Sequence, residues 1–506
     1  MKKVCLFALF ITLSLPGIAQ QTGDAYKNSD APIDERVENL LSLMTLEEKI
    51  GQMTQLNITL INTTGEQRDV ELVEEKARMY LQDHHIGSFL NGEAVPAEQW
   101  YEYIIGLQKI AVEQTRLGIP IIYGIDHMHG ASYLKGATIF PHNINLAATF
   151  NTEHAKQTGR ITALESADLG HNWNFAPVLD LGQNPSWARL YETYGESPHV
   201  VSTMGKAYVN GLIHNEEIAP YKIAATGKHF LGYSVPKSGW DRTPVDLSDQ
   251  TIHEFHLPAF KAAIDAGMQT IMVNSSEING VPVHASKKIL TDLLRDELKF
   301  DGVIVTDWDD IGKLVNYHYT ARDYTEATEM AVNAGIDMSM TPLSLAFNES
   351  MLELVEQGRI TEERIDESVR RILTLKFELG LFEYPYPRND RFNRIGSAEH
   401  KAKAKAAADE SIILLKNEND ILPISKETNK ILVIGPNAHG KPELAGGWTI
   451  GWQGGEPERY PEEMHTVFTA LEAEFSNSHI TLLPFNASAS EIRSEAQNHE
   501  IGRAHV

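Results

Sequence analysis

Apolar, β-branched runs alternate with longer amphipathic segments along most of the chain. Segments such as Lys287–Leu298 and Glu349–Leu373 lie between several runs and repeat apolar positions at helical spacing. Strands that alternate with helices predict a parallel sheet with right-handed crossovers. With about seven or eight such units, the pattern predicts an α/β fold of the (β/α)8 TIM-like barrel type. The runs expected to form strands are Ile86–Leu90, Ile119–Asp126, Trp173–Asp180, Tyr221–Phe230, Gln269–Ser276, Gly302–Trp308 and Gly335–Met340.

Local signals mark where this pattern begins and ends. Thr45–Glu48 has the form of a capping box, which opens a helix. The alternation stops at 382–390, a stretch rich in proline and aromatic residues that suits a linker. A helix over Ser397–Lys416 and a buried strand over Ile431–Ile434 then begin a second α/β domain, and Ser488–His499 has a helical pattern.

These signals give the expected domain boundaries. We expect residues 20–385 to form the barrel, 386–410 a linker and helix, and 411–506 the start of the second domain, which we expect to be truncated because too few residues remain to complete it. The last residues, Glu500–Val506, can be back-translated into the opening of a sequencing-library adapter. We therefore predict that the natural protein is longer, the alternative being a genuine C-terminus that matches by chance.

The first residues resemble a secretory signal peptide. Lys2 and Lys3 precede the apolar run Val4–Leu15, and small residues follow at Gly17 and Ala19. The run is shorter than the ~20 apolar residues of a membrane span, so we predict cleavage of residues 1–19 over an N-terminal anchor helix. The expected location is periplasmic or secreted, with no membrane attachment after cleavage.

Composition narrows the function classes. The 506 residues carry 69 acidic and 44 basic side chains, a formal charge of −25, which disfavours nucleic-acid partners. A hydrophobic share of 42% and a charged share of 22% are typical of soluble globular proteins. The only cysteine, Cys5, lies in the predicted signal, so disulfides and thiolate catalysis are excluded from the mature chain.

Polar and ionisable residues terminate the predicted strands, where a parallel barrel builds its active site. A single aspartate there is weak evidence, because strands commonly stop at a turn-forming aspartate. Several such groups at one rim are harder to explain structurally. They are Asp126, Asp180, Lys228, His229, Asn274 and Asp307.

Asp307 is the sharpest candidate among them. The run Val303–Val305 would bury its strand and place the carboxylate at the rim beside Trp308. An indole packs against the apolar face of a sugar ring while a carboxylate attacks the anomeric carbon. The alternative is an acidic helix N-terminus that complements the helix dipole, which is our interpretation of Asp309 and Asp310.

Several ordered motifs resemble those of glycoside hydrolase family 3, particularly its β-glucosidases and exo-β-glucanases. The resemblance spans roughly Arg36 to Asn486 and implies a retaining exo-hydrolase with a (β/α)8-like barrel followed by an α/β sandwich. The motifs are GIDHMHG, NWNFAPVLDLGQNPSWARLYETYGESP, GKHFLGYS, MVNSSEINGVPVHAS, FDGVIVTDWDDI and AGGWTIGWQGG.

The resemblance also implies roles for individual residues. Asp307 in VTDW would be the nucleophile, and Asp126 in GID would bind hydroxyls on the far edge of the terminal glucose. Hydroxyls nearer the reacting centre would be held by Arg189 with Lys228 and His229. The same resemblance places Met272 in the site wall, Trp308 and Trp452 on either side of the next sugar, and Trp448 nearby.

Two departures from the family pattern matter. Relatives usually have a tyrosine three residues after the methionine, where this chain has Ser275, so the usual hydroxyl partner of the nucleophile is changed. The acid/base glutamate of this branch comes from the second domain, beyond the end of this chain, and Glu491, Glu495 and Glu500 lie too early to be assigned.

The loop after KHF has no histidine, unlike the N-acetylglucosaminidase branch, which argues against amino-sugar substrates.

We expect neither a metal nor a cofactor. The histidine pairs in DHMHG and IHEFH lack a third ligand at metal-site spacing. The segment ILVIGPNAHG follows a predicted strand without the G-x-G-x-x-G pattern of dinucleotide sites.

The leading hypothesis is therefore an exported β-glucosidase acting on β-linked oligosaccharides, and the rival within the family is a β-xylosidase. Asp126 distinguishes them, because xylose lacks the C6 hydroxymethyl group that this carboxylate would meet. Two further hypotheses remain: a metal-dependent barrel hydrolase that uses His127, His129 and His229, and a catalytically crippled carbohydrate-binding fragment.

Overall fold

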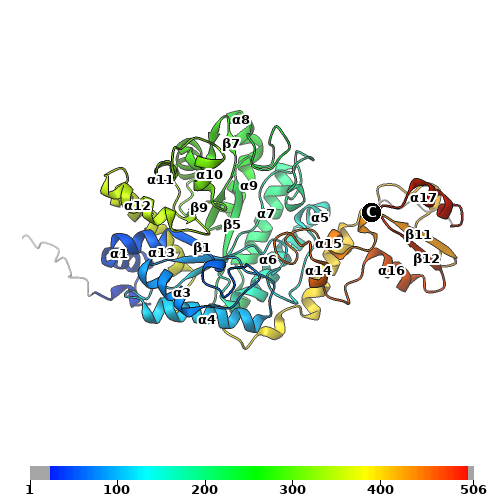
Figure 1. Ribbon diagram of the computed structural model, residues 1–506, viewed down its shortest axis with the longest axis horizontal. Helices are drawn as coiled ribbons and strands as arrows, with labels where there is room; N and C mark the ends of the chain where they lie inside the picture. The colour runs from blue at the N-terminus through cyan, green and yellow to red at the C-terminus, as the bar shows by residue number, and fades with distance from the viewer. Residues whose placement is uncertain (1–22, 500–506) are drawn as a thin grey trace, which may run out of the picture.

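The computed structural model describes residues 23–499 (Figure 1). The predicted signal with Cys5 and the predicted adapter-derived tail lie outside these residues. Eight parallel strands form one sheet in the order β10-β1-β2-β3-β4-β5-β6-β9, and a bridge between Val305 and Met338 joins its two edges. The predicted barrel is thereby confirmed. Its strands are β1 (Thr54–Asn57), β2 (Ser88–Leu90), β3 (Ile122–Ile125), β4 (Trp173–Asn174), β5 (Ala224–Phe230), β6 (Thr270–Val273), β9 (Val303–Val305) and β10 (Ser339–Met340).

Helices surround this sheet and bury their apolar faces against it (Figure 1). The segment predicted as a helix over 287–298 is π-helical at Lys288–Glu297, and a short antiparallel hairpin of β7 (Glu277–Ile278) and β8 (Val281–Pro282) follows β6. The helices of the barrel are α1 (Ile33–Leu43), α2 (Leu46–Gln52), α3 (Glu74–Arg78), α4 (Ala97–Gln114), α5 (Asn143–Ala148), α6 (Thr152–Ser166), α7 (Pro198–Ile213), α8 (Asp249–Thr251), α9 (Leu257–Ile264), α10 (Asp310–Asn316), α11 (Tyr324–Ala334), α12 (Ala346–Glu356) and α13 (Glu362–Glu378).

The first strand, β1, was not predicted from the sequence. Its residues, TQLN, are mostly polar, so they form no hydrophobic run, yet all four are buried. Inside the barrel the polar groups find partners: the Thr54 hydroxyl lies 3.0 Å from the Ile50 carbonyl, and the Gln55 amide donates to the Ser88 hydroxyl at 2.8 Å. Buried polar side chains that are hydrogen-bonded can replace apolar ones in a strand.

Three predicted elements end earlier than expected. The run Trp173–Asp180 is regular strand only at β4, although a bridge between Val178 and Lys228 continues the contact with β5. The segment Glu349–Leu373 is divided between α12 and α13 at Gly358, whose φ of +68° ends the first helix. Helix α14 (Ala398–Ser411) begins after its N-cap Ser397, close to the predicted start, but stops five residues before Lys416.

The N-terminal end of the barrel is closed by a lysine from α13. Lys376 is fully buried, and its Nζ donates to Gln52 Oε1 at 2.6 Å, to the Gly87 carbonyl at 2.9 Å and to the Pro120 carbonyl at 2.8 Å. These acceptors precede β1, β2 and β3. One side chain therefore ties the starts of three strands to the last helix of the barrel.

Replacing Lys376 with methionine should change how stability depends on pH. Burial lowers the pKa of Lys376 from 10.5 to about 7, so between these values the unfolded chain binds more protons than the folded chain. The free energy of unfolding of the wild type should then rise with pH above 7, by up to about 1.4 kcal/mol per pH unit. Urea unfolding at pH 7, 8 and 9 should show this rise, and a flatter one in Lys376→Met. Parallel pH dependences would contradict the assignment.

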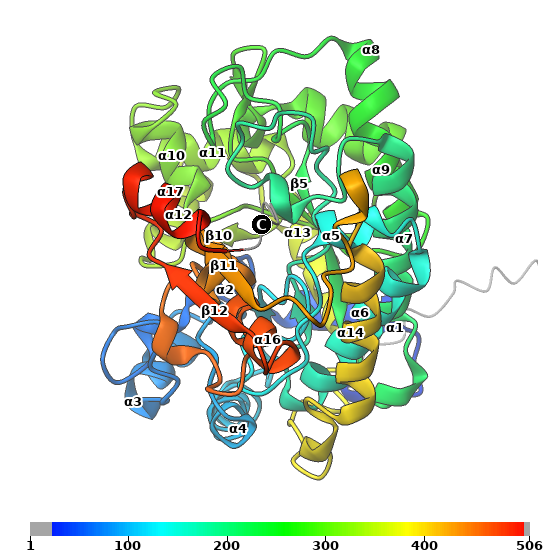
Figure 2. The same cartoon turned by 90° about the vertical axis from the view of Figure 1, so that its right-hand side faces the viewer.

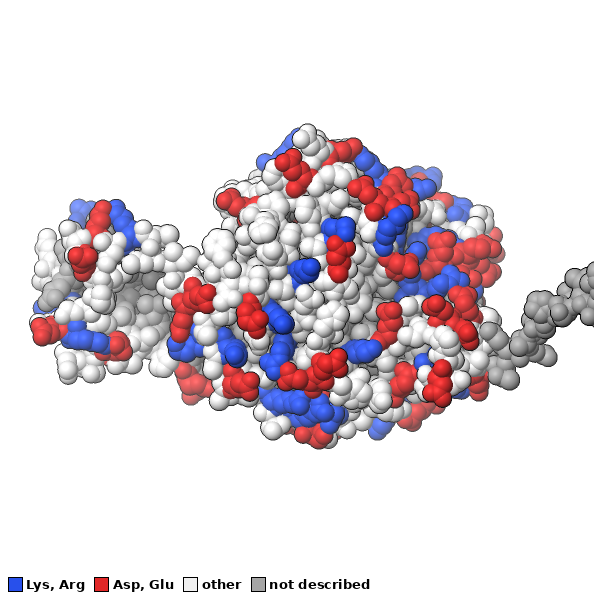
Figure 3. Space-filling view, turned by 180° about the vertical axis from the view of Figure 1, so that it is seen from behind, with Lys and Arg blue, Asp and Glu red and all other residues white. Residues whose placement is uncertain are grey.

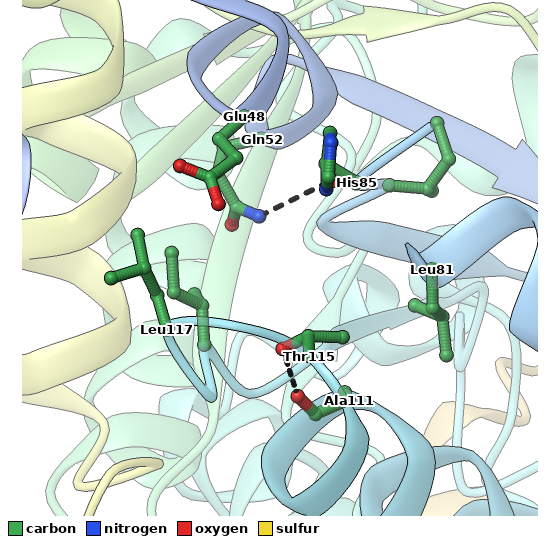
Figure 4. A pocket seen from close by; sticks show the side chains of 9 residues that line it. Glu48, Gln52, Leu81, His85, Ala111, Thr115 and Leu117 are labelled. Carbon is green, nitrogen blue, oxygen red and sulfur yellow. Dashed lines mark hydrogen bonds between the residues drawn. The ribbon is translucent and has the colours of Figure 1, made fainter. Parts of the chain in front are cut away.

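A small cavity lies at this same end of the barrel (Figure 4). Glu48 and Gln52 of α2 line it together with His85, which precedes β2, and Thr115, which follows α4. Figure 4 shows the Gln52 amide directed at the His85 carbonyl, 3.3 Å away. None of the candidate residues lines this cavity, so it is separate from the predicted site.

A second, smaller α/β unit follows α14 (Figure 1). Strands β11 (Lys430–Ile434) and β12 (His479–Leu483) pair in parallel, with α16 (Val467–Glu474) and α17 (Ala489–Ala496) beside them, whereas α15 (Lys441–Ala445) lies near α14 at the barrel. Helix α14 packs on α5 and α6, and Figure 2 shows it running along α6. The expected second α/β domain is confirmed, whereas its boundaries remain predictions.

Charged side chains of both signs lie on the surface of the molecule. On the face drawn in Figure 3, basic and acidic side chains are intermingled, and no continuous basic area is visible. Among residues 23–499, no helix has both the length and the apolar character needed to cross a bilayer.

Candidate active site

The carboxyl ends of β3, β5 and β9 bring four of the predicted site residues to one end of the barrel. Asp126 directly follows β3, Lys228 and His229 lie in β5, and Asp307 follows β9 after one residue. Parallel strands deliver their last side chains to the same rim, which explains why residues far apart in sequence meet here.

Asp126 and Lys228 form a buried ion pair. Lys228 Nζ donates to Asp126 Oδ1 at 2.8 Å, and the lysine side chain is only 2% exposed. Burial raises the pKa of Asp126, and Lys228 opposes this rise. The ammonium also lies 5.3 Å from the ring centroid of Trp448, which comes from the C-terminal part of the chain. The pair therefore offers a hydrogen-bond acceptor, the carboxylate, directly beside a hydrogen-bond donor, the ammonium.

Arg189 is fixed by a carboxylate that sequence reasoning missed. Its Nε and Nη2 donate to the two carboxylate oxygens of Glu192 at 2.8 and 2.9 Å, a bidentate geometry that orients the guanidinium plane. Although burial lowers the pKa of an arginine, Glu192 keeps the pKa of Arg189 well above its ordinary value. The spacing of three residues between the two is the sequence signal that could have revealed Glu192.

His229 is held in one tautomer by Asp180. The imidazole Nδ1–H donates to Asp180 Oδ2 at 2.8 Å, and the backbone N–H of His229 donates to the same oxygen at 3.0 Å. Burial holds the pKa of His229 well below 6.5, so the ring is neutral and its Nε2 is left as an acceptor. Burial also raises the pKa of Asp180 to about 7. Asp180, noted in the sequence only as a strand-end residue, therefore positions His229.

Asp307 lies beside cations and is still partly accessible. Its Oδ1 accepts from the Trp308 backbone N–H at 2.6 Å, and its side chain is 14% exposed. Oδ2 lies 3.9 Å from His229 Nε2 and 3.8 Å from Arg242 Nη2. Burial raises the pKa of a carboxyl, yet Arg242 above all other groups holds the pKa of Asp307 well below its usual range. The carboxylate is thus ionised at neutral pH.

Asp310 does more than complement the dipole of a helix N-terminus, which was its interpretation from the sequence. It does begin α10, but its side chain is buried and accepts from the Ser275 hydroxyl at 2.6 Å and from Lys313 at 2.6 Å. Ser275, at the position where a tyrosine was expected, lies 3.2 Å from Asp307 Oδ2. Hydrogen bonding, not helix capping alone, therefore accounts for Asp310.

The remaining predicted residues lie at different distances from this cluster. Met272 is buried in β6 and pairs in register with Val305 of β9. Trp308 is half-buried and packs against the barrel core. Trp452 is 60% exposed. Its carbonyl accepts a hydrogen bond from the Trp448 N–H at 3.0 Å, and this turn connects Trp452 to Trp448, which lies beside Lys228.

The segment that carries Trp448 is docked on the barrel by two histidines. His142 Nε2 donates to the Ala445 carbonyl at 2.9 Å, and His129 Nε2 lies 3.2 Å from the Thr449 hydroxyl. Burial lowers the pKa of both histidines, so both rings are neutral. An ion pair of 2.9 Å between Glu93 and Arg459 adds a further contact. We refer to residues 445–459 as the docked segment.

The histidines invoked for a metal site have separate partners. His127 Nε2 lies 3.2 Å from His171 Nδ1, His129 Nδ1 donates to the Phe140 carbonyl at 2.6 Å, and His229 binds Asp180. Within residues 23–499, no three or more His, Cys, Asp or Glu side chains are grouped as metal ligands. This arrangement does not favour the metal-dependent hypothesis.

Comparison with known proteins gives consistent matches. The model "Glycosyl hydrolase family 3 N terminal domain" matches residues 45–375, and "Glycosyl hydrolase family 3 C-terminal domain" matches residues 412–503. A lysosomal beta glucosidase of Dictyostelium discoideum is 45% identical over 448 residues, which cover 85% of this chain and 54% of that protein. A beta-xylosidase of Formosa agariphila is 32% identical, with 89% and 58% covered. The chain spans just over half the length of these relatives.

A solved structure agrees with the sequence matches. The beta-glucosidase from Listeria innocua in complex with glucose superposes with a TM-score of 0.79 at 33% identity. The superposition covers 92% of this chain and 63% of that one.

Proposed function

The chain belongs to glycosyl hydrolase family 3, and from this premise we propose that it is a retaining, exo-acting glycoside hydrolase that releases terminal β-D-glucose from β-glucosides. The observation that carries the proposal is an ionised carboxylate, Asp307, beside a neutral imidazole and a buried Asp126–Lys228 pair at one end of the barrel. This combination suits a neutral, polyhydroxylated substrate.

The reaction proceeds in two displacements at the anomeric carbon. An Asp307 oxygen attacks C1, the bond from C1 to the aglycone oxygen breaks, and a glycosyl ester forms. Water then attacks C1, the ester bond breaks, and the carboxylate charge returns to Asp307. A second carboxyl group must protonate the leaving oxygen in the first step and remove a proton from water in the second.

The second carboxyl group is not assigned among residues 23–499. Glu491 accepts from the Ser488 hydroxyl and N–H in the capping box of α17, and Glu495 lies on the same exposed helix. We propose instead that the acid/base group comes from outside the described residues, as the family resemblance implies.

The other candidate residues bind sugar. Asp126 and Lys228 bind hydroxyls at the far edge of the terminal glucose, while Arg189 and His229 bind those nearer Asp307. Met272 lines the wall of the same site. The next sugar packs against Trp308 and Trp452, with Trp448 covering the Asp126–Lys228 pair.

β-Xylosidase activity is the second candidate, because several relatives carry that name. Xylose has no C6 hydroxymethyl group and would leave the acceptor capacity of Asp126 unused, so we favour glucose. We further propose that the protein is exported to the periplasm or beyond, on the strength of the signal-like residues 1–19.

Hydrolysis rates of paired aryl glycosides test the proposal. The 2,4-dinitrophenyl glycosides are suited, because their leaving group needs no acid catalyst. We expect the glucoside to have a kcat/KM at least about tenfold above that of the xyloside. Preference for the xyloside would establish the second candidate, and glucose binding without turnover of either compound would indicate a carbohydrate-binding fragment.

A further inference from the structure

The nucleophile candidate lacks a strong side-chain hydrogen bond to one of its oxygens. Asp307 Oδ1 accepts from the Trp308 backbone, but Oδ2 has only the Ser275 hydroxyl at 3.2 Å. That hydroxyl has a single proton and lies closer to Asp310, at 2.6 Å. Ser275 is therefore committed to Asp310, and Oδ2 needs another partner.

Arg242 is the cation directed at this oxygen. Its Nη2 lies 3.8 Å from Asp307 Oδ2, while Nη1 donates to Asp241 Oδ2 at 2.7 Å. The Nε of Arg242 is buried and has no hydrogen-bond partner among the described residues. Only Nη1 is therefore hydrogen-bonded within the loop, whereas Nε and Nη2 are not.

The loop that carries Arg242 is built to hold it in place. The buried indole of Trp187 donates from Nε1 to Asp241 Oδ1 at 2.9 Å, so Asp241 bridges Trp187 and Arg242. The Asn184 amide donates to the Pro236 carbonyl at 3.0 Å. Gly239, with φ of +78°, lies so close to Ser186 that a Cβ would be 2.7 Å from the serine Cβ. This arginine is anchored to the same segment that carries Arg189.

We propose that Arg242 is the positioning residue of the nucleophile: its guanidinium orients the Asp307 carboxylate toward the anomeric carbon and keeps it negatively charged. The inference rests on the proposed function and extends it. In the first displacement Asp307 loses its charge to the ester, and in the second the charge returns. A fixed cation beside Oδ2 favours the return, so Arg242 supports hydrolysis of the intermediate.

Other charged groups also face Asp307, and they define what Arg242 adds. Burial opposes the ionisation of Asp307, and Arg242 lowers the pKa of this carboxyl more than His229, Arg189 or Lys313 does. Arg189 forms a bidentate pair with Glu192, whereas Arg242 binds Asp241 through Nη1 alone and its Nη2 lies toward Asp307. The titratable or charged groups that interact with Asp307 are Asp126, Arg189, His229, Tyr233, Arg242, His284, Asp310 and Lys313.

The experiment measures covalent labelling of the full chain by 2,4-dinitrophenyl 2-deoxy-2-fluoro-β-D-glucoside, followed as intact mass between pH 3 and 8. We expect Arg242→Gln to lose labelling at a pH about one unit or more above the wild type, because the nearby cation no longer favours the carboxylate. The labelled variant should also lose its sugar about tenfold more slowly. Arg242→Lys should fall between the two.

Lys237→Gln is the matched control. Lys237 is an exposed cation of the same loop that pairs with Asp246 and does not face Asp307. It should label like the wild type. If folded Arg242→Gln, or Arg242→Lys where the glutamine variant fails to fold, has the wild-type pH dependence and release rate, the inference is overturned. Absence of label on the wild type at every pH would instead refute the proposed function.

Discussion

Replacing Asp307 with alanine should reduce turnover of 2,4-dinitrophenyl β-glucoside by about 10⁴-fold or more, because no other group can form the glycosyl ester. The loss should be in kcat as well as kcat/KM, since the bond to C1 forms only along the reaction path. Far-ultraviolet circular dichroism should be unchanged, because the carboxylate follows β9 and is not part of its ladder.

Chemical rescue distinguishes a lost nucleophile from a damaged site. In Asp307→Gly, azide can occupy the space of the carboxylate and attack C1 from the same face, which yields α-glucosyl azide. Asp309→Ala is the control, because this neighbouring carboxylate belongs to no hydrogen bond of the cluster, and we expect its rates to stay within a few-fold of the wild type. Equal losses in both variants would indicate a structural effect.

Replacing Asp126 with alanine should reduce both stability and the preference for glucose. The change leaves the buried Lys228 ammonium without its carboxylate, which typically costs about 3–5 kcal/mol of unfolding free energy. Removing the acceptor for the C6 hydroxyl should reduce kcat/KM by about 10²-fold for the glucoside. The xyloside has no such hydroxyl and should lose less.

Asp126→Asn separates the two effects. The amide retains the shape and an acceptor oxygen but not the charge, so it should retain more of the glucose preference than alanine does. Denaturant unfolding and paired glucoside and xyloside kinetics measure both quantities. Identical losses for the two sugars in Asp126→Ala would mean that the carboxylate acts only by holding Lys228.

Apolar runs predicted the barrel well because most parallel strands that are buried on both faces consist of apolar residues. β1 could not be predicted in this way, because its residues TQLN are mostly polar and are buried with hydrogen bonds to Ile50 and Ser88. Gly358 divides a segment whose apolar spacing continues on both sides of it. The spacing of apolar residues indicates which positions are buried. A helix end such as Gly358 depends instead on backbone conformation, and a buried polar strand such as β1 depends on hydrogen-bond partners elsewhere in the chain.

Some residues of the site were predictable from the sequence and others were not. Asp126, Lys228, His229 and Asp307 were identifiable because strand ends in a parallel barrel converge. Arg242 was not, because it lies in a loop where neither strand nor helix periodicity applies, and only the fold brings it to Asp307. Its relation to Asp307 follows from the distance between the two side chains, which the sequence alone does not contain.

The docked segment couples two distant parts of the chain. Thr449 and His129 are 320 positions apart, yet their contact helps to place Trp448 over the Asp126–Lys228 pair. A ligand bound against Trp448 would therefore favour the docked arrangement, and docking would favour the ligand by the same free energy. Under the proposed function, a substitution at His142 should therefore change the affinity for sugar without altering a residue placed against the substrate.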